Sequence, residues 1–185
     1  ADRARLADRV DPRQPGLSPG AAPATGPGAV CHHSGMADTP TPGKKAPAIT
    51  LLDQNGEKVK LADHAGHPVL VYFYPKADTP GCTAQSCGLR DVAGDIGDTA
   101  IIGISPDEPA KLKRFDEKYG LGFTLLSDPD HKVAERYGVW GEKSMYGRKY
   151  MGIIRSAFLI GADGKVVEAW PKISPKDTPK KLLAA

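Results

Sequence analysis

The chain of 185 residues has only three cysteines, no run of basic residues and no long apolar segment. The cysteines are too few and too unevenly spaced for the disulfide framework of a small secreted protein, so we expect a reducing compartment. Lysines and arginines are interleaved with acids, and the formal net charge is only +3. The sequence therefore lacks the electrostatic footprint of a nucleic-acid-binding protein.

No apolar stretch approaches the ~20 residues that a helix needs to cross a bilayer, since the most apolar segment, 69–74, ends at Pro75. Arg3, Arg5 and Arg9 are not followed by the apolar stretch of a secretory signal. We therefore expect a cytoplasmic protein without a membrane partner.

Residues 1–41 are rich in Pro, Gly and Ala and lack a periodic apolar pattern, which predicts a disordered tail. Met36 resembles an ordinary start, so the residues before it are either a mis-set start or a genuine extension. The adjacent Cys31, His32 and His33 lack the spacing of a tetrahedral metal site, and we expect no metal and no cofactor. Residues 42–185 are predicted to form one domain.

That domain shows alternating strand and helix patterns. The runs 69–74 and 100–105 are uninterrupted and apolar, as in central strands covered on both faces. The order of elements predicts an α/β domain of the thioredoxin-like fold, with a central mixed β-sheet flanked by helices on both faces. Further strands are expected at 49–52, 58–61, 156–160 and 165–170, and helices between 75 and 100 and at 109–119, 131–137 and 176–185.

The segment that follows residues 69–74 has the features of a reactive cysteine site. Thr79 is a suitable N-cap, Pro80 suits the first helical position, and Cys82 then falls in the first turn. Unpaired amides and the helix dipole favour an anion there, and the thiolate is the reactive form of cysteine. The alternative, a buried structural cysteine, does not explain the cap or the proline.

The pattern Pro-x3-Thr-x2-Cys, formed by Pro75, Thr79 and Cys82, resembles the active-site signature of peroxiredoxins. More distant segments resemble the bacterioferritin comigratory protein or peroxiredoxin Q branch, and the similarity extends from Pro42 to the C-terminus. These segments are Gly103-Ile-Ser-Pro-Asp107, Leu126-Ser-Asp-Pro-Asp130, Gly141-Glu-Lys-Ser-Met-Tyr-Gly147 and the run from Gly152 through Arg155 to Ile160.

The resemblance implies a thiol peroxidase that reduces hydrogen peroxide and organic hydroperoxides, with Cys82 as the attacking thiolate. Thr79 would orient thiolate and peroxide by hydrogen bonds, and Arg155 would carry a permanent positive charge beside both. Pro75 would shield the site from water, and Gly81 would let the backbone approach the peroxide. Without the motif, Arg155 would be assigned to a surface ion pair, and Pro75 and Gly81 to ordinary turns.

Cys87 is the candidate for a second thiol that condenses with oxidised Cys82 and protects it from over-oxidation. Five positions apart in one helix, the two Cα atoms would lie about 8–9 Å from each other. A disulfide needs a separation within about 7 Å, so the helix must open, which Gly88 and Gly94 would ease. The disulfide would then be reduced by thioredoxin or a similar thiol reductant. A packed core cysteine is the alternative for Cys87.

Two other functions share features of this sequence. A thioredoxin-like disulfide oxidoreductase would carry Cys-x-x-Cys, whereas four residues separate Cys82 from Cys87. A non-enzymatic peroxide sensor or chaperone-like binding protein shares the oxidisable cysteine, and steady turnover rather than one stoichiometric oxidation separates the enzyme from it. The branch resemblance implies a monomer and leaves the preferred hydroperoxide open.

Deletion of residues 1–35 is expected to leave the melting temperature and the peroxidase rate nearly unchanged, because this segment has no apolar face with which to dock. Thermal unfolding and peroxide consumption of the full and shortened chains measure both. A large loss of either would show that the tail is a working part of the protein.

Overall fold

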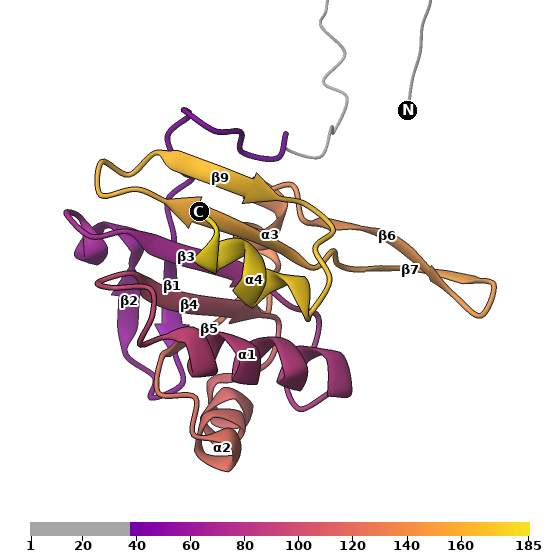
Figure 1. Cartoon of the computed structure of the whole chain (residues 1–185). Helices are drawn as coiled ribbons and strands as arrows, with labels where there is room; N and C mark the ends of the chain where they lie inside the picture. Colours follow the sequence, from indigo (N-terminus) through magenta and orange to yellow (C-terminus); the bar gives the residue numbers. More distant parts are fainter. Residues whose placement is uncertain (1–37) are drawn as a thin grey trace, which may run out of the picture. The chain divides into compact units, whose positions relative to one another are not determined.

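The computed structural model describes residues 38–185. The predicted tail, apart from residues 38–41, and the Cys31-His32-His33 segment lie outside these residues, so the boundary at residue 42 stays a prediction. Within the described part, seven strands form one mixed sheet in the order β2-β1-β5-β4-β3-β8-β9, and two further strands form a separate hairpin (Figure 1). No helix in residues 38–185 is long and apolar enough to cross a membrane.

The bounds of the elements agree with most of the expected segments, and the mixed sheet with helices on both faces is confirmed. The strands are β1 (Thr50–Asp53), β2 (Lys58–Lys60), β3 (Val69–Phe73), β4 (Ala100–Ser105), β5 (Thr124–Ser127), β6 (Trp140–Met145), β7 (Arg148–Ile153), β8 (Ser156–Ile160) and β9 (Val166–Trp170). The helices are the 3-10 turn η1 (Leu61–His64), α1 (Pro80–Val92), α2 (Pro109–Tyr119), α3 (Lys132–Arg136) and α4 (Asp177–Leu183).

Strand β3 is an interior strand of the sheet, next to the central strand β4, and all five of its residues are buried. It pairs in parallel with β4 and antiparallel with β8. Val71 and Phe73 join a core on one face with α3, whereas Leu70 and Tyr72 join a second core with α1, α2 and α4. Because side chains alternate along a strand, a run buried at every position needs both faces covered, as the apolar pattern predicted.

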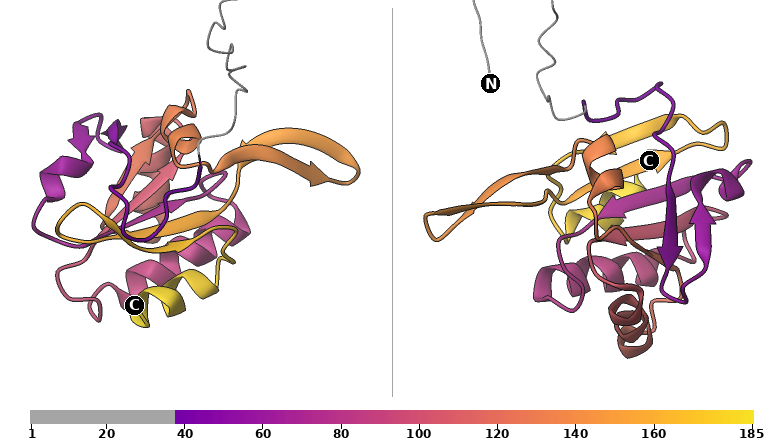
Figure 2. Two further views of the ribbon diagram at one scale, coloured as in Figure 1. Left: turned by 90° about the horizontal axis from the view of Figure 1, so that it is seen from above. Right: turned by 180° about the vertical axis from the view of Figure 1, so that it is seen from behind.

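The sequence reading missed three strands. β5 is short and joins β4 to β1 within the sheet. β6 and β7 form an arm that extends away from the sheet (Figure 2). The arm turns at Tyr146 and Gly147, whose positive φ angles of 52° and 77° are those of a tight hairpin turn. Its strands are mostly exposed, so they lack the apolar alternation by which strands are recognised.

Gly103 of β4 lies between Tyr72 and Leu125 on the neighbouring strands. A Cβ atom there would lie 2.7 Å from the Tyr72 ring and 2.9 Å from Leu125. The ring is buried, and its hydroxyl is bonded to Ser86 at 2.8 Å, so it has little freedom to move. We expect Gly103→Ala to lower the free energy of unfolding by about 1–3 kcal/mol in urea denaturation.

Gly94→Ala is the matched control, because a Cβ at that position meets nothing within 4 Å. It is expected to leave stability unchanged or to raise it by up to about 1 kcal/mol. Equal stability of the two variants would contradict the close packing described around β4.

Candidate active site

Helix α1 begins one short loop after β3 and carries both cysteines of the described residues. Thr79 is its N-cap residue and Pro80 occupies the first position, as predicted. Cys82 is the third residue of the helix and is only 1% exposed. Cys82 therefore belongs to the first turn, whose amides lack partners within the helix, and its burial strengthens electrostatic contacts.

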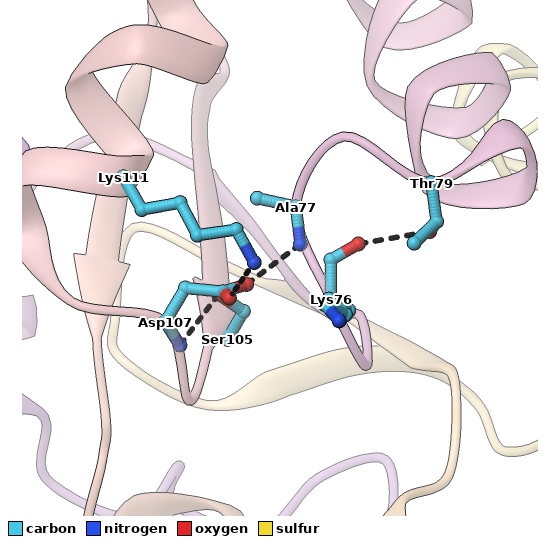
Figure 3. A network of polar contacts seen from close by, with 6 residues as sticks. All are labelled: Lys76, Ala77, Thr79, Ser105, Asp107 and Lys111. Carbon is cyan, nitrogen blue, oxygen red and sulfur yellow. Dashed lines mark hydrogen bonds and ion pairs between the residues drawn. The ribbon is translucent and has the colours of Figure 1, made fainter.

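Thr79 occupies the N-cap position, but its side chain does not cap the helix. Within residues 38–185 the Thr79 hydroxyl makes no capping bond and instead donates to the Lys76 carbonyl at 2.9 Å (Figure 3). The loop turns back at Asp78, which has a left-handed φ of 59°, and the hydroxyl bonds within this loop. A hydroxyl has one hydrogen, so this bond leaves only its lone pairs available to another group.

The loop before α1 is tied to the next strand by Asp107. The Asp107 carboxylate accepts from the Ala77 amide at 2.6 Å and from the Ser105 hydroxyl at 3.0 Å, and it pairs with Lys111 (Figure 3). An ionised carboxylate that accepts several hydrogen bonds is a strong anchor. Asp107 ends the Gly103–Asp107 motif, but the sequence alone did not indicate that it anchors this loop.

Two residues of α2 fix the side chain of Asp78, the residue with the left-handed backbone conformation. Lys118 of α2 contacts both Asp78 carboxylate oxygens at 2.9 and 3.0 Å, and the Tyr119 hydroxyl donates at 2.7 Å. The Tyr119 hydrogen bond, followed by the bond from Lys118, lowers the pKa of Asp78. These contacts stabilise a backbone conformation that is uncommon for a residue other than glycine.

Arg155 adjoins the start of β8, which neighbours β3 on the side away from β4. It immediately precedes β8, and the pairing of Phe73 with Ser156 brings it to the end of β3 where α1 begins. Its Nη2 donates to Cys82 Sγ at 3.3 Å, while Nη1 donates to Gln85 Oε1. A guanidinium this close favours a negative charge on the sulfur.

Gly81 and Lys143 also lie near Arg155. A Cβ atom on Gly81 would lie 3.4 Å from Arg155 Nη2, an ordinary contact, so the guanidinium packs closely over this helical turn. Lys143 of the arm donates to the Ile153 carbonyl at 3.0 Å. Burial, and then the positive charge of Arg155, lower the pKa of Lys143, which marks a positive local potential. Pro75 follows the end of β3 and is half-buried.

Cys87 lies on a different face of α1. Residues Cys82, Gln85 and Leu89 are buried, whereas Cys87 is half-buried and lines an open pocket of about 530 Å³ with Lys118 and Tyr119. Within the described residues neither cysteine forms a disulfide. No group of three or more His, Cys, Asp or Glu side chains in residues 38–185 is arranged to hold a metal ion.

The comparisons with known proteins agree with this geometry. Residues 42–169 match the model of the AhpC/TSA family. The chain is 58% identical to the peroxiredoxin Bcp of Escherichia coli over 126 residues, which are 67% of this chain and 81% of the relative. It is 46% identical to the peroxiredoxin Bcp of Bacillus subtilis over 137 residues, which are 73% of this chain and 87% of the relative.

Solved structures show the same likeness. The bacterioferritin comigratory protein of Xanthomonas campestris, studied for its alkyl peroxide reduction activity, is 34% identical with a TM-score of 0.70. The match covers 80% of this chain and 95% of that protein. A fold and a sequence that agree over this length place the chain in the AhpC/TSA family, among the thiol peroxidases of the peroxiredoxin Bcp and Q type.

Proposed function

We propose that Cys82 is the nucleophile of this peroxidase and that Arg155 activates it. The 3.3 Å contact between Arg155 Nη2 and Cys82 Sγ carries this assignment. The thiolate attacks one peroxide oxygen, an S–O bond forms as the O–O bond breaks, and the second oxygen leaves with the bonding electron pair. That oxygen takes a proton to become water or an alcohol, and Cys82 becomes a sulfenic acid.

The surrounding groups stabilise the charge that moves in this step. The guanidinium cannot lose its proton, so it favours the thiolate and then the departing oxygen. Thr79 is suited to accept a hydrogen bond from the peroxide, because its own hydrogen is bonded to Lys76. Pro75 is proposed to shield the site from water. Gly81 is proposed to let the backbone approach the peroxide.

We propose that Cys87 resolves the sulfenic acid. Its thiol would attack the Cys82 sulfur, forming an S–S bond and releasing water. Both cysteines lie in the intact helix α1, five residues apart, which places their Cα atoms about 8–9 Å from each other. Such a separation exceeds the limit of about 7 Å for a disulfide, so α1 must open locally before the bond forms.

A thioredoxin-type reductant is proposed to reset the enzyme by thiol–disulfide exchange. Cys87 is the more accessible cysteine in this state and lines the open pocket beside α2, which supports attack from that side. The Xanthomonas relative supports organic hydroperoxides as substrates in addition to hydrogen peroxide. A monomeric state and a cytoplasmic location stay predictions.

Cys82→Ser is expected to abolish turnover, because a serine hydroxyl does not form a comparable nucleophilic anion near neutral pH. The assay follows NADPH consumption through thioredoxin and thioredoxin reductase with hydrogen peroxide and several alkyl hydroperoxides. Substantial residual turnover would overturn the assignment of Cys82. A single stoichiometric oxidation of the wild-type chain, without steady consumption, would instead indicate a sensor.

Arg155→Ala is expected to slow peroxide reduction about a hundredfold, the loss typical when one donor to a developing negative charge is removed. The thiolate fraction of Cys82 should fall as well, which ultraviolet absorbance and the rate of alkylation by iodoacetamide measure. Arg148→Ala, which removes an exposed arginine of the arm, is the control and should react like the wild type. Equal rates in both variants would contradict the role of Arg155.

Oxidation by one equivalent of peroxide is expected to produce a Cys82–Cys87 disulfide together with loss of hydrogen-exchange protection around residues 81–91. Peptide mapping identifies the bond, and exchange measured on reduced and oxidised protein reports the opening of α1. Cys87→Ser should still react once with peroxide but fail to turn over with thioredoxin. A disulfide from Cys82 to Cys31 or to a second chain, or unchanged protection, would defeat this scheme.

A further inference from the structure

Helix α4, at the C-terminal end of the chain, packs against α1 (Figure 1). One contact between them is a buried hydrogen bond from Gln85 Nε2 to Thr178 Oγ1 at 2.9 Å. Both residues have no exposed surface. The Thr178 hydroxyl in turn donates to the Ser174 carbonyl at 3.1 Å, so its single hydrogen is already used.

This arrangement determines which way the Gln85 amide points. Because the Thr178 oxygen has only lone pairs to offer, the amide must present its NH2 group to Thr178. The Gln85 carbonyl oxygen then points the opposite way, where it accepts from Arg155 Nη1. A guanidinium has donors only, so a rotated amide would set two donors against each other.

We infer that Thr178 is a positioning residue that orients Gln85 and thereby holds the Arg155 guanidinium against the Cys82 sulfur. The inference rests on the proposed function, in which Arg155 and Cys82 form the reactive centre. The chain of bonds runs from Ser174 through Thr178 and Gln85 to Arg155 and ends at Cys82 Sγ.

The segment before α4 contacts the same centre at two further points. The Ile173 amide donates to the Arg155 carbonyl at 3.0 Å, and Pro175 lies 3.5 Å from the position of a Cβ atom on Gly81. The C-terminal segment is therefore tied to both the backbone and the side-chain partners of Arg155. Within the described residues, the Thr178 hydroxyl accepts one hydrogen bond, from Gln85 Nε2, so removing this oxygen would leave that buried amide nitrogen without its partner on α4.

The test compares Thr178→Val, which keeps the shape but removes the hydroxyl, with Thr178→Ser, which keeps it. Thr178→Val is expected to slow the first oxidation of Cys82 by hydrogen peroxide about threefold to tenfold, a loss on the scale of one hydrogen bond. Thr178→Ser should stay within about twofold of the wild type. The pH dependence of the rate of Cys82 alkylation should also change in Thr178→Val, and it should stay that of the wild type in Thr178→Ser.

A double variant identifies the route of the effect. If Thr178 acts through Arg155, then Arg155→Ala combined with Thr178→Val should be no slower than Arg155→Ala alone. Pro179→Ala is the control for packing, since Pro179 is buried in α4 against Gly88 and makes none of these hydrogen bonds. It should lower the melting temperature while preserving the rate of the first oxidation.

A wild-type rate in Thr178→Val would overturn the inference, as would equal slowing in Thr178→Ser or Pro179→Ala. A double variant clearly slower than Arg155→Ala would also overturn it, because Thr178 would then act by another route. The proposed function fails separately, through turnover that persists in Cys82→Ser. If Thr178→Val oxidises at the wild-type rate while Cys82→Ser is inactive, the role of Thr178 is wrong but the proposed role of Cys82 stands.

Discussion

The contact between the Arg155 guanidinium and the Cys82 sulfur is the interaction on which the rest of the site depends. It joins two residues 73 positions apart, and it exists because β8 pairs with β3 in the register that sets Ser156 beside Phe73. A half-buried cation needs partners for its remaining donors. Gln85 is one such partner, and the packing of α4 on α1 is tied to it through Thr178.

Helix α1 has two requirements that conflict. An intact first turn favours the proposed thiolate at Cys82, whereas the proposed disulfide between Cys82 and Cys87 requires the helix to open. The buried face of the helix is held by hydrogen bonds to Tyr72 and Thr178, and the loop before it is held by Asp107. Cys87 lies on the more exposed face. Opening therefore has to break these hydrogen bonds and also to move Cys82 and Leu89 out of the core on that face of the sheet.

The parts of the fold that the sequence predicted are those with a strong local signal. The uninterrupted apolar run 69–74 identified β3, and Pro80 after Thr79 identified the start of α1. The sequence did not predict the two strands of the arm, β6 and β7. They pair with each other and are mostly exposed, so their sequence lacks the apolar alternation that marks a half-buried strand. The sequence indicated Thr79 as the N-cap residue, but only the structure shows that its hydroxyl bonds to Lys76, beside the left-handed turn at Asp78.

By itself, the sequence determined that a strand ends just before a helix whose first turn carries a cysteine, because apolar runs, capping residues and proline act over a few neighbouring positions. Its motifs also indicated the family and named Arg155. Only the tertiary structure decided which nitrogen of Arg155 faces the sulfur, which way Gln85 points and that Thr178 lies behind it. Those facts depend on strand register and on the packing of α4 against α1, and such long-range contacts leave no local periodicity in the chain.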